Sequence, residues 1–401
     1  MRILISASTY PRWRGDSLPG FVHEYCRELV AKGHSVTALV PHADGAAKRE
    51  VMDGVEVIRY QYWPVRRGQT AAYSGNTKSS PKSLSAAAKI MALGATQFVQ
   101  TVRFTRSRNV DVINPHWVIP QGVTAVAAGW VTRRPTLTII HGGDVFTMNG
   151  PLMKRVKRWA LHRSTRVAVN SSATLAVCKQ LAPRSDYQVI PMGLTMPEAA
   201  ITTERVDLKS RETTLLFIGR IPEEKGLRYL LQALALLKGE NIKLEVAGTG
   251  PAETEMRELA QELGVASRVR WLGWLDRTQF DEVYQRADIF VGPSITAKSG
   301  WVEAFGLVFA ESLARSVPVI GTKTGGIIDV VNDGENGFLI EEKSPEAIAT
   351  AVRRYLEDAD LYNRHKLAAR DGVMTKFNWP SIIVRYEKLL RETVQATRRR
   401  R

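Results

Sequence analysis

Residues 214–251 read TLLFIGRIPEEKGLRYLLQALALLKGENIKLEVAGTGP, a short unit that decides the fold of the chain. Two aliphatic runs, Thr214–Ile218 and Lys243–Ala247, have the composition of buried strands. Between them, Gly226–Leu237 carries apolar residues with the period of a helix. Two strands connected through a helix pair in parallel, so this stretch predicts a doubly wound α/β sheet.

The same alternation of strands and helices extends in both directions. After a helix predicted at Pro251–Leu263, further strands are expected at Val269–Leu272, Ile289–Gly292, Val317–Thr322 and Gly337–Ile340. Upstream, a helix is expected at Phe21–Lys32 and strands at Arg2–Ser6, Ser35–Val40, Val55–Tyr60, Val110–Asn114, Leu137–Ile140 and Arg166–Asn170. This rhythm is typical of parallel sheets with crossover helices.

A chain of 401 residues exceeds what one hydrophobic core organises, and the rhythm pauses between residues 193 and 212. We therefore predict two Rossmann-like domains, residues 1–195 and residues 196–377. The final helical pattern, at about residues 378–401, is expected to pack back on the first domain. The polar segment Arg66–Lys82 is predicted to be a mobile loop.

The composition indicates an ordinary globular protein, with 44% hydrophobic and 24% charged residues. Cys26 and Cys178 are too few for a disulfide framework or a four-ligand metal site, and they indicate a reducing compartment. The first residues lack the pattern of a signal peptide, and no run of about 18 apolar residues occurs. The most apolar stretch, Val118–Val131, is interrupted by Pro120 and predicts a buried loop and helix. We expect a cytoplasmic protein.

The net charge of +16 is concentrated in the first half of the chain. Residues 1–200 hold 26 of the 56 Lys and Arg residues but 11 of the 40 Asp and Glu residues. Such an excess attracts polyanions or anionic lipid surfaces, although a solvated face without a partner is the alternative. The clusters Arg133-Arg134 and Lys154–Arg158 are candidates for contact with an anionic membrane, at the inner face of the plasma membrane. Nucleic acid is not expected as a partner, because aromatic interleaving and the known binding modules are absent.

The strongest candidate for chemistry is the run EAFGLVFAE at residues 303–311. Glu303 falls in a glycine-containing loop and Glu311 in a helix, so both carboxylates can face one site. A carboxylate accepts hydrogen bonds from two hydroxyl groups, which suits the vicinal diol of a ribose or a hexose. Two glutamates on a helix surface are the alternative, but burying Glu within an apolar run is costly without partners.

A pair of cations follows the first strand of the central unit. Arg220 and Lys225 come after the turn at Gly219. Two cations at a strand end can neutralise a pyrophosphate and stabilise a leaving nucleoside diphosphate, and glycine lets the backbone turn tightly before them. The next strand ends in Gly248-Thr249-Gly250-Pro251, which by itself indicates a tight turn.

In the first domain, the run His141-Gly142-Gly143-Asp144 follows a predicted strand. A lone histidine at a strand end is more often structural than catalytic, and Asp144 either orients His141 or caps the following helix. His116 is a second candidate, for which a structural role is favoured. Near the N-terminus, the loop with Gly15 and Asp16 precedes a helix, and a helix N-terminus favours an anion.

Together these motifs resemble the retaining glycosyltransferases of family 4, the glycosyl transferases group 1. The matches stand in the family's order: HG-x-D at residues 141–144, G-R-x4-K-G at 219–226, G-x-G-P at 248–251, E-x7-E at 303–311, then Gly325-Gly326 and Asn336-Gly337. The resemblance covers nearly the whole chain. It implies the GT-B fold, in which two Rossmann-like doubly wound domains face a central cleft.

The resemblance also implies roles for individual residues. Glu311 binds the ribose, and Glu303 with nearby main-chain amides binds the hexose. Arg220 and Lys225 stabilise the departing diphosphate, and His141 faces the donor sugar near the reacting carbon. The residues expected to be catalytic are His141, Arg220, Lys225 and Glu303. The residues expected to bind the donor are Gly15, Asp16, Gly219, Arg220, Lys225, Gly248, Leu272, Glu303, Phe305, Gly306, Leu307 and Glu311.

The expected reaction is the transfer of a hexose, with retention of configuration, from a UDP- or GDP-sugar to a glycan or lipid-linked acceptor bound by the first domain. It is expected to serve cell-surface polysaccharide or glycolipid synthesis without a cofactor or a metal ion, because no cluster of His, Cys and carboxylates has metal spacing. Asp358-Ala359-Asp360 matches the DxD motif of a different glycosyltransferase fold, but it ends a polar helix and is expected to be surface. A nucleotide-sugar epimerase and a non-catalytic anion-binding protein are the alternatives.

Overall fold

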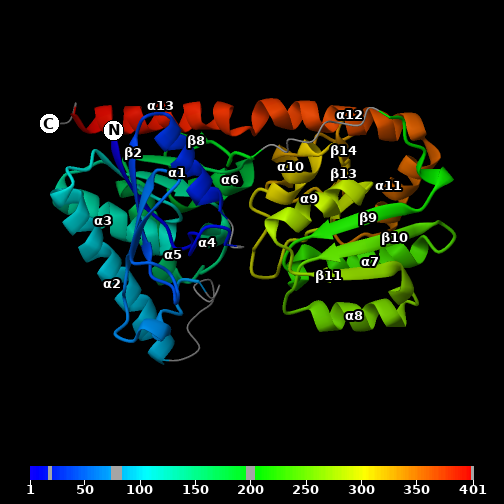
Figure 1. Cartoon of the computed structure of the whole chain (residues 1–401), viewed down its shortest axis with the longest axis horizontal. Coiled ribbons are helices and arrows are strands. Elements are labelled where there is room, and N and C mark those ends of the chain that lie inside the picture. The colour runs from blue at the N-terminus through cyan, green and yellow to red at the C-terminus, as the bar shows by residue number, and fades with distance from the viewer. Residues whose placement is uncertain (17–19, 74–83, 196–203, 399–401) are drawn as a thin grey trace. The chain divides into compact units, whose positions relative to one another are not determined.

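The computed structural model describes residues 1–16, 20–73, 84–195 and 204–398. The chain divides into two compact units (Figure 1): unit 1 comprises Met1–Gly193 with Trp379–Arg401, and unit 2 comprises Leu194–Asn378. Each unit contains mainly parallel β-structure covered by helices. The predicted α/β class with two Rossmann-like domains is confirmed.

Unit 1 contains one sheet in the order β3-β4-β2-β1-β5 and a second in the order β6-β7-β8. The strands are β1 (Arg2–Ser6), β2 (Ser35–Pro41), β3 (Arg49–Met52), β4 (Val55–Tyr60), β5 (Val112–Pro115), β6 (Leu137–Ile140), β7 (Arg166–Val169) and β8 (Tyr187–Val189). Bridges from Ile113 to Thr136 and from His116 to Ile139 join β5 to β6. Because β1 pairs with β2 on one side and β5 on the other, a topological switch point lies between β1 and β5.

The helices of unit 1 lie between these strands, apart from the last one. They are α1 (Phe21–Ala31), α2 (Leu84–Ser107), α3 (Val123–Thr132), α4 (Gly143–Phe146), α5 (Pro151–Arg163), α6 (Ser172–Leu181) and α13 (Trp379–Arg398). Shorter turns are η1 (Arg66–Gly68) and η3 (Val118–Gly122). The stretch at 118–131 therefore forms a loop followed by a helix, as predicted, but its end is not buried, because Trp130 and Val131 are exposed. Most of the predicted mobile loop after η1, residues 74–82, lies outside the described residues.

Helix α13 belongs to the core of unit 1 although it comes from the end of the chain. Trp379, Ile383 and Tyr386 are buried in the same hydrophobic cluster as residues of α1. The Tyr386 hydroxyl donates to the Ile190 carbonyl at 2.8 Å, and Trp379 Nε1 donates to the Glu24 carboxylate at 3.1 Å. The two stretches of unit 1 are thus held by both apolar and polar contacts.

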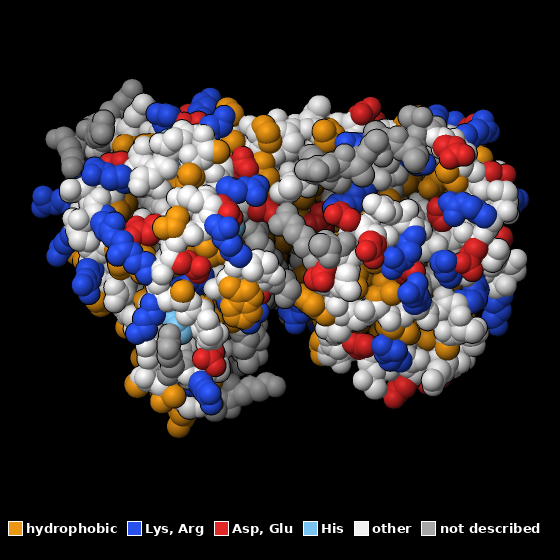
Figure 2. Space-filling view, viewed as in Figure 1, with side chains coloured by type: hydrophobic (Ala, Val, Ile, Leu, Met, Phe, Trp, Pro, Cys, Tyr) orange, Lys and Arg blue, Asp and Glu red, His pale blue; other side chains and the backbone are white. Residues whose placement is uncertain are grey.

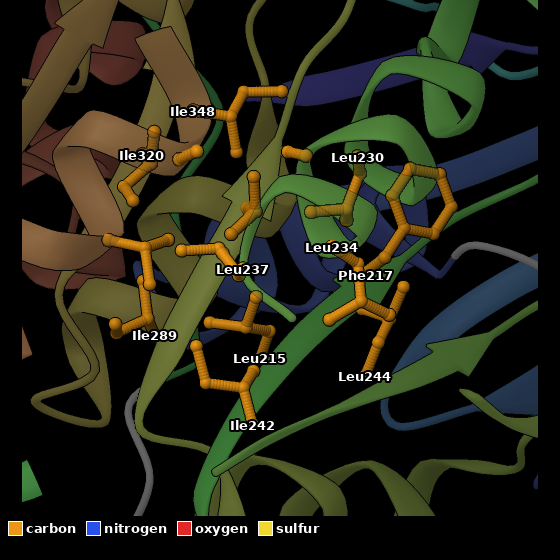
Figure 3. Packing of buried hydrophobic residues seen from close by; sticks show 14 of the residues in the cluster. Leu215, Phe217, Leu230, Leu234, Leu237, Ile242, Leu244, Ile289, Ile320 and Ile348 are labelled. Atoms are coloured by element: carbon orange, nitrogen blue, oxygen red, sulfur yellow. The ribbon is translucent and has the colours of Figure 1, made fainter. Parts of the chain in front are cut away.

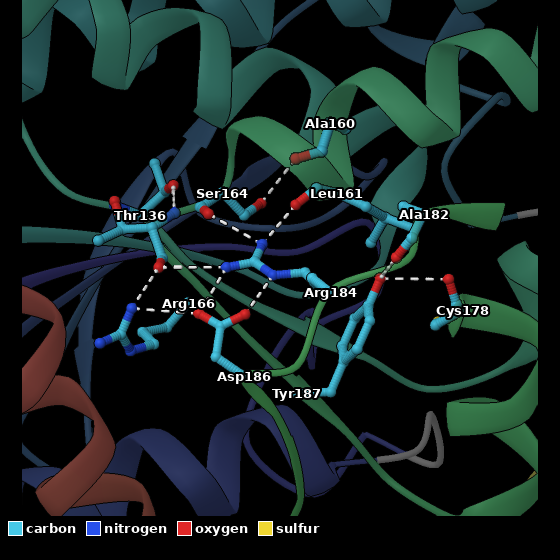
Figure 4. Close-up of polar contacts among 11 residues, drawn as sticks. Thr136, Ala160, Leu161, Ser164, Arg166, Cys178, Ala182, Arg184, Asp186 and Tyr187 are labelled. Carbon is cyan, nitrogen blue, oxygen red and sulfur yellow. Dashed lines mark hydrogen bonds and ion pairs between the residues drawn. The ribbon is translucent and has the colours of Figure 1, made fainter. Parts of the chain in front are cut away.

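An ion-pair network ties the short strand β8 to its neighbours (Figure 4). Arg184 Nη2 donates to the Asp186 carboxylate at 2.8 Å, and its Nη1 donates to the Ser164 carbonyl at 3.0 Å. Arg166 on β7 donates to the same carboxylate at 3.1 Å. The hydrogen bond from Arg184 lowers the pKa of Asp186 from its ordinary value of 3.8, so the network stays charged at neutral pH.

Unit 2 is a fully parallel sheet in the order β11-β10-β9-β12-β13-β14. The strands are β9 (Thr213–Ile218), β10 (Ile242–Ala247), β11 (Val269–Gly273), β12 (Ile289–Gly292), β13 (Val319–Thr322) and β14 (Gly337–Ile340). The helices are α7 (Leu227–Leu236), α8 (Glu253–Glu262), α9 (Arg277–Arg286), α10 (Leu307–Ala314), α11 (Pro345–Glu357) and α12 (Ala359–Lys376). Single 3-10 turns are η4 (Leu208–Ser210), η5 (Glu223–Lys225), η6 (Ala266–Arg268) and η7 (Ile327–Asp329). A second switch point lies between β9 and β12.

The core of unit 2 forms where α7 presents an aliphatic stripe to the sheet (Figure 3). Leu230, Leu234 and Leu237 recur at helical spacing and lie in one cluster with Leu215 of β9 and Leu244 of β10. Burying each of these side chains contributes about 1.5–3 kcal/mol relative to leaving it in water. Such close packing holds the carboxyl ends of β9 and β10 in place.

The sequence does not predict β3 or β8. Both are short edge strands, of four and three residues, and a strand of that length shows too few alternations to be recognised. All the strands that the sequence does predict are present, and their ends differ from the predicted ends by at most two residues. Residues 196–203, within the predicted linker, lie outside the described residues. No helix in the described part of the chain has the length and hydropathy needed to cross a bilayer.

We expect Ile383→Ala to lower the free energy of unfolding by about 2–5 kcal/mol, because it leaves a cavity in the core beneath α13. Ile383 is fully buried, whereas the next residue, Val384, is 50% exposed. Val384→Ala is therefore the matched control and should change stability by no more than about 0.5 kcal/mol. Urea unfolding followed by tryptophan fluorescence measures both. Equal effects of the two substitutions would contradict the described packing of α13.

Candidate functional site

The predicted site residues of unit 2 lie at the carboxyl ends of its strands. Arg220 and Lys225 follow β9, and Glu303 lies in the loop after β12, the strand beside β9. Gly248 follows β10, and Leu272 lies near the end of β11. Because the sheet is parallel, all these loops leave it at the same edge, and the first two flank the switch point where open α/β sheets bind ligands.

Glycines let the loops after β9, β10 and β11 pack backbone against backbone. Gly219 donates its N–H to the Ala247 carbonyl at 2.9 Å, and Gly248 donates to the Gly273 carbonyl at 2.7 Å. Gly248 has φ +136°, and a Cβ atom there would lie 1.9 Å from the Gly219 oxygen. No side chain fits at this position, so the edge of the sheet presents main-chain groups here.

An ion pair joins the two loops that flank the switch point. Lys225 Nζ contacts the Glu303 carboxylate, and the two side chains are 20% and 13% exposed. The Lys225 ammonium also lies 5.9 Å from the centre of the Trp301 ring. Gly226, with φ +72°, permits this approach, because a Cβ atom there would lie 1.9 Å from the Pro293 carbonyl oxygen. The structure thus brings together two predicted site residues from different loops.

The backbone of Glu303 is held by the glycine pair that follows β13. Gly326 donates its N–H to the Glu303 carbonyl at 2.8 Å. Gly325 has φ +56°, and a Cβ atom on it would lie 2.0 Å from the same carbonyl oxygen. This approach requires glycine and fixes the main chain that carries the carboxylate.

Phe305, Gly306 and Leu307 carry the chain from this loop into α10. Phe305 is buried, and its ring meets that of Phe377 edge to face at 5.4 Å. Gly306 has φ +81° and precedes the first helical residue, and no side chain caps the helix. The first N–H groups of α10 therefore begin at the carboxyl edge of the sheet, where a helix N-terminus favours an anion.

Glu311 lies in the second turn of α10 and is partly buried. The Tyr284 hydroxyl donates to Glu311 Oε2 at 3.4 Å. Burial raises the pKa of Tyr284 well above its ordinary value of 10.0, and the negative charge of Glu311 raises it further, so the hydroxyl keeps its proton. Tyr284 therefore contacts a residue of the candidate site, Glu311, although no sequence motif identifies Tyr284.

Arg220 is exposed, and its side chain has no ion-pair or hydrogen-bond partner among the described residues. Its position is nevertheless defined by the main chain around it. The next residue, Ile221, donates to the Thr249 carbonyl at 3.1 Å and accepts from the Ala252 N–H at 2.9 Å. The guanidinium can therefore meet an anionic ligand from a fixed loop.

A further contact that the sequence does not reveal holds the loop after β12. Glu342, which follows β14, accepts hydrogen bonds from the N–H and the hydroxyl of Thr296, both at 2.7 Å. Burial opposes ionisation, but these hydrogen bonds lower the pKa of Glu342 below its ordinary value of 4.5. The Thr296 hydroxyl also lies 3.2 Å from that of Thr324, close to the glycine pair. Glu342 is thus an anionic anchor for the segment that leads to Glu303.

In unit 1, His116 and His141 follow β5 and β6 and form a hydrogen-bonded pair. His116 Nδ1 lies 2.9 Å from His141 Nε2, and the rings are within 13° of parallel. His116 is fully buried, and its Nε2 has no partner among the described residues. Because a buried N–H without a partner is costly, we assign the proton of His116 to Nδ1, from which it is donated to His141. His116 thereby sets the tautomer of His141.

Two aromatic rings and an amide complete the surroundings of His141. The rings of Phe21 and Trp117 each lie 5.0 Å from the His141 ring, and Asn170 donates to the His141 carbonyl at 3.1 Å. Trp117 has φ +72°, a conformation that costs a bulky residue about 1–3 kcal/mol and that is concentrated at functional sites. His141 is therefore held in a defined position at the carboxyl end of β6.

Asp144 is buried in the first turn of α4. Its carboxylate accepts the N–H of Val118, which ties α4 to the turn after β5. This contact with Val118 neither orients His141 nor caps the following helix, the two roles expected for Asp144. It anchors the segment that follows His141 to the segment that follows His116.

Lys157 of α5 is buried beneath α4 and donates to the carbonyl oxygens of Val145 and Thr147. Burial lowers the pKa of this ammonium, and the charge of Asp144 opposes that shift. The prediction that Lys154–Arg158 form an exposed basic cluster is therefore wrong for Lys157. The helix turns this side chain inward, where the carbonyl oxygens of α4 replace its water.

The loop after β1 contains Gly15 and Asp16. Gly15 is exposed and has φ +76°. The Asp16 carboxylate is 1% exposed and accepts three hydrogen bonds from Arg12: from its N–H at 2.8 Å, Nε at 2.9 Å and Nη2 at 2.7 Å. These contacts close the loop on itself. The binding of donor by Gly15 and Asp16 stays a prediction.

Metal binding finds no support among the described residues, which contain no group of three or more His, Cys, Asp or Glu side chains able to hold an ion. The two carboxylates of the DxD sequence have other contacts. Asp358 caps α12 by accepting the Leu361 N–H at 2.8 Å, and Asp360 pairs with Arg205 at 2.9 Å. Both are exposed, as expected for this segment.

Comparison with known sequences places both units in glycosyltransferase families. Residues 201–372 match the family described as "Glycosyl transferases group 1", and residues 21–193 match the "Glycosyl transferase 4-like domain". An uncharacterized glycosyltransferase of Methanocaldococcus jannaschii is 31% identical over 270 residues, which are 63% of this chain and 68% of the relative. The GDP-mannose-dependent alpha-(1-6)-phosphatidylinositol monomannoside mannosyltransferase of Mycobacterium tuberculosis is 25% identical, with 97% of this chain and 98% of the relative covered.

Solved structures share the fold at lower identity. Sucrose-phosphate synthase from Thermosynechococcus elongatus superposes with a TM-score of 0.76 at 20% identity, covering 98% of this chain and 99% of that one. Anabaena HepE in complex with UDP-glucose gives a TM-score of 0.70 at 19% identity, covering 98% of this chain and all of the other. These findings support a GT-B glycosyltransferase and give no support to an epimerase.

We expect Gly325→Ala to destabilise the protein more than Gly334→Ala. Both glycines have positive φ, but a Cβ atom at Gly325 would collide with the Glu303 carbonyl, whereas one at Gly334 would meet no atom within 4 Å. The control therefore carries only the backbone cost, about 1–2 kcal/mol. The collision should add about 1–3 kcal/mol in Gly325→Ala. Urea unfolding measures the difference, and equal losses would contradict the tight packing of the loop that carries Glu303.

His116 should make the stability of the fold depend on pH. Burial lowers the pKa of His116 well below its ordinary value of 6.5, and the neighbouring His141 lowers it further. The unfolded chain therefore takes up a proton near pH 6.5 that the folded protein excludes, so this contribution to stability is present above that pH and declines as the pH falls. The loss is at most about 1.4 kcal/mol for each pH unit.

Comparing wild type with His116→Gln isolates this effect from the titration of other groups. Urea unfolding at several pH values should show that the advantage of wild type over the variant shrinks between pH 6.5 and pH 5, because Gln does not titrate. A difference that stays constant over this range would show that His116 is not held neutral.

Proposed function

The chain belongs to the glycosyl transferases group 1, and from this premise we propose that it moves a hexose from a UDP- or GDP-sugar to a glycan or lipid-linked acceptor. The observation that carries the proposal is the contact between Lys225 and Glu303 at the switch point of unit 2. It sets a cation suited to a diphosphate beside a carboxylate suited to sugar hydroxyl groups.

The departing diphosphate is proposed to be bound from the loop after β9 and from the start of α10. Arg220 and Lys225 supply two positive charges, and the first N–H groups of α10 add the positive end of a helix. Donors held in place before the reaction stabilise the charge that develops on a leaving group, at no cost of reorganisation. In this proposal the two cations take the place of a metal ion.

The two glutamates are proposed to bind the two sugars of the donor. Glu303 accepts hydrogen bonds from hydroxyl groups of the hexose. This sugar is assigned to Glu303 because the carboxylate contacts Lys225, the lysine assigned to the neighbouring diphosphate. Glu311, in the second turn of α10, accepts hydrogen bonds from the ribose hydroxyl groups. The Tyr284 hydroxyl orients its carboxylate. The spacing of the two residues thus follows the order of hexose, diphosphate and ribose along the donor.

The reaction is proposed to retain the anomeric configuration. The acceptor hydroxyl forms its bond to the anomeric carbon on the face from which the diphosphate oxygen leaves. An oxygen of the departing diphosphate then takes the proton of the acceptor. His141 keeps its predicted role of facing the donor sugar near the reacting carbon, and its tautomer is set by His116.

The acceptor is proposed to bind unit 1, whose sequence carries most of the basic excess. The name of the Mycobacterium tuberculosis relative describes transfer to a phosphatidylinositol mannoside, and that relative matches nearly the whole chain. An acceptor with a lipid anchor and negative charge would suit a basic unit. We therefore place the reaction in glycolipid or cell-surface polysaccharide synthesis, in the cytoplasm at the inner face of the plasma membrane.

Glu311→Ala and Lys225→Ala should each lower kcat/KM by a factor on the order of 10² or more, because each removes a group proposed to bind the donor in the transition state. The assay measures release of nucleoside diphosphate from UDP- and GDP-sugars in the presence of acceptor and EDTA. Loss of wild-type activity on adding EDTA would contradict the metal-independent mechanism.

Glu258→Ala and Lys238→Ala are the matched controls, since both side chains are exposed in unit 2 and belong to no predicted site. They should retain wild-type kinetics. A Glu311 or Lys225 variant with full activity would remove that residue from the site. Incubation with donor alone distinguishes a transferase from an epimerase, because an epimerase would convert the donor without an acceptor and a transferase would not.

A further inference from the structure

Helix α2 of unit 1 has apolar residues on its exposed side as well as on the side that packs against the core. Its fully buried residues are Leu93, Gln97, Thr101 and Thr105, three of which are polar, and the partly buried residues that pack beside them against the core are Ile90, Phe98, Val102 and Phe104. Its exposed residues along the first four turns are Leu84, Ser85, Ala88, Met91, Ala95 and Val99, all but one of which are apolar. A surface helix normally turns its apolar side to the core and its polar side to water.

The exposed apolar residues form one continuous line, called here the α2 stripe: Leu84, Ala88, Met91, Ala95 and Val99. Their spacing of three or four residues places them one above another on the same side of the helix. The large members are 93%, 74% and 57% exposed at Leu84, Met91 and Val99. In Figure 2, hydrophobic side chains show at the lower end of unit 1, where Figure 1 draws the first turns of α2.

The orientation of α2 is fixed by its buried side. Gln97 donates through Nε2 to the Ser6 hydroxyl at 2.7 Å, and its Oε1 accepts from the Tyr60 hydroxyl at 3.3 Å. Rotating the helix to bury the stripe would break these bonds and leave buried polar groups without partners. The stripe therefore faces outward as a built feature of unit 1.

The charge in the stretch of sequence that contains the stripe has one sign. Residues 57–110 contain no Asp or Glu but nine Lys and Arg residues. The stripe continues along the same side of α2 into Arg103 and Arg106, which are exposed. Helix α3 packs against α2, and its Trp130 is 79% exposed shortly before Arg133. An apolar line with a cationic border and a nearby tryptophan has the composition of a helix that lies in a lipid interface.

We propose that α2 docks unit 1 on an anionic lipid bilayer, with the stripe in contact with acyl chains and the arginines at the headgroups. A second copy of the chain is a poorer occupant, because a symmetric contact through α2 would bring together two helices that hold no carboxylate of their own to pair with their arginines. The proposal gives the acceptor side of the proposed function a physical surface. Its test uses no sugar donor, so it can fail while the proposed transfer reaction stands.

The experiment is flotation of the full chain with vesicles of phosphatidylcholine alone and of phosphatidylcholine with an equal amount of phosphatidylglycerol. Wild type should float with the anionic vesicles and much less with the neutral ones. The double variant Met91→Glu/Val99→Glu should lose at least about tenfold in partitioning, because it puts two charges into the apolar contact. Both changed side chains are exposed, so the fold should remain intact, which circular dichroism checks.

Val384→Glu is the matched control, since Val384 is half exposed in the same unit but lies on α13. It should bind vesicles as wild type does. A variant of the stripe that binds as well as wild type would overturn the proposal. Wild type that sediments as a dimer without lipid, and as a monomer with the stripe changed, would assign the surface to a second copy and would also overturn it.

A second readout reports on contact depth. Met91→Cys, labelled with a polarity-sensitive thiol dye, should show a blue shift on adding anionic vesicles, while Val384→Cys should not. The two native cysteines are buried and therefore leave the label at the introduced position. High salt should weaken binding without abolishing the shift of the bound fraction, because salt screens the arginines and not the apolar contact. A dye that stays in water on bound protein would contradict insertion of the stripe.

Discussion

The contact between Lys225 and Glu303 is the constraint on which the candidate site of unit 2 depends. The two residues are 78 positions apart, and their loops meet because β9 and β12 are neighbours in the sheet although β10 and β11 lie between them in the chain. The approach is close enough only with glycine at Gly226 and Gly325, where any Cβ atom would strike a carbonyl oxygen. The core beneath β9 and β10 keeps the strands from shifting. The contact between the two charged side chains therefore depends on the close backbone packing at Gly226 and Gly325.

Unit 1 also has a switch point, between β1 and β5, but with different chemistry. The loop after β1 contains Asp16, but Arg12 occupies its carboxylate, and the turn after β5 contains His116, which burial keeps neutral. What remains at this edge is the imidazole of His141 among aromatic rings. Unit 2 by contrast presents two cations and two carboxylates at its edge. This division suits the proposed reaction, in which charge develops on one substrate, since the groups proposed to stabilise that charge are all in one unit.

The sequence predicted what depends on local pattern and missed what depends on distant neighbours. Buried strands were recognisable as aliphatic runs, and the glycine-rich turns marked their carboxyl ends. Lys157 was misjudged because most of its neighbours in the chain are basic, while the carbonyl oxygens that it contacts come from α4 and from Thr147 directly after that helix. Tyr284 and Glu342 could not be found, because their partners lie on other elements and no spacing links them. The motifs named the residues of the candidate site, and the sheet order explains how two of them meet.

Helix α2 shows the opposite relation between sequence and structure. The sequence does not single out a helix at these residues, and only the structure shows that polar side chains take three of its four fully buried positions. Gln97 is drawn inward by the hydroxyl groups of Ser6 and Tyr60, and this leaves Met91 and Val99 in water. Natural sequences break the rule of apolar-in and polar-out where function compensates for the cost. A lipid surface would cover the exposed stripe and meet the surrounding arginines at once, which no contact within the described chain does.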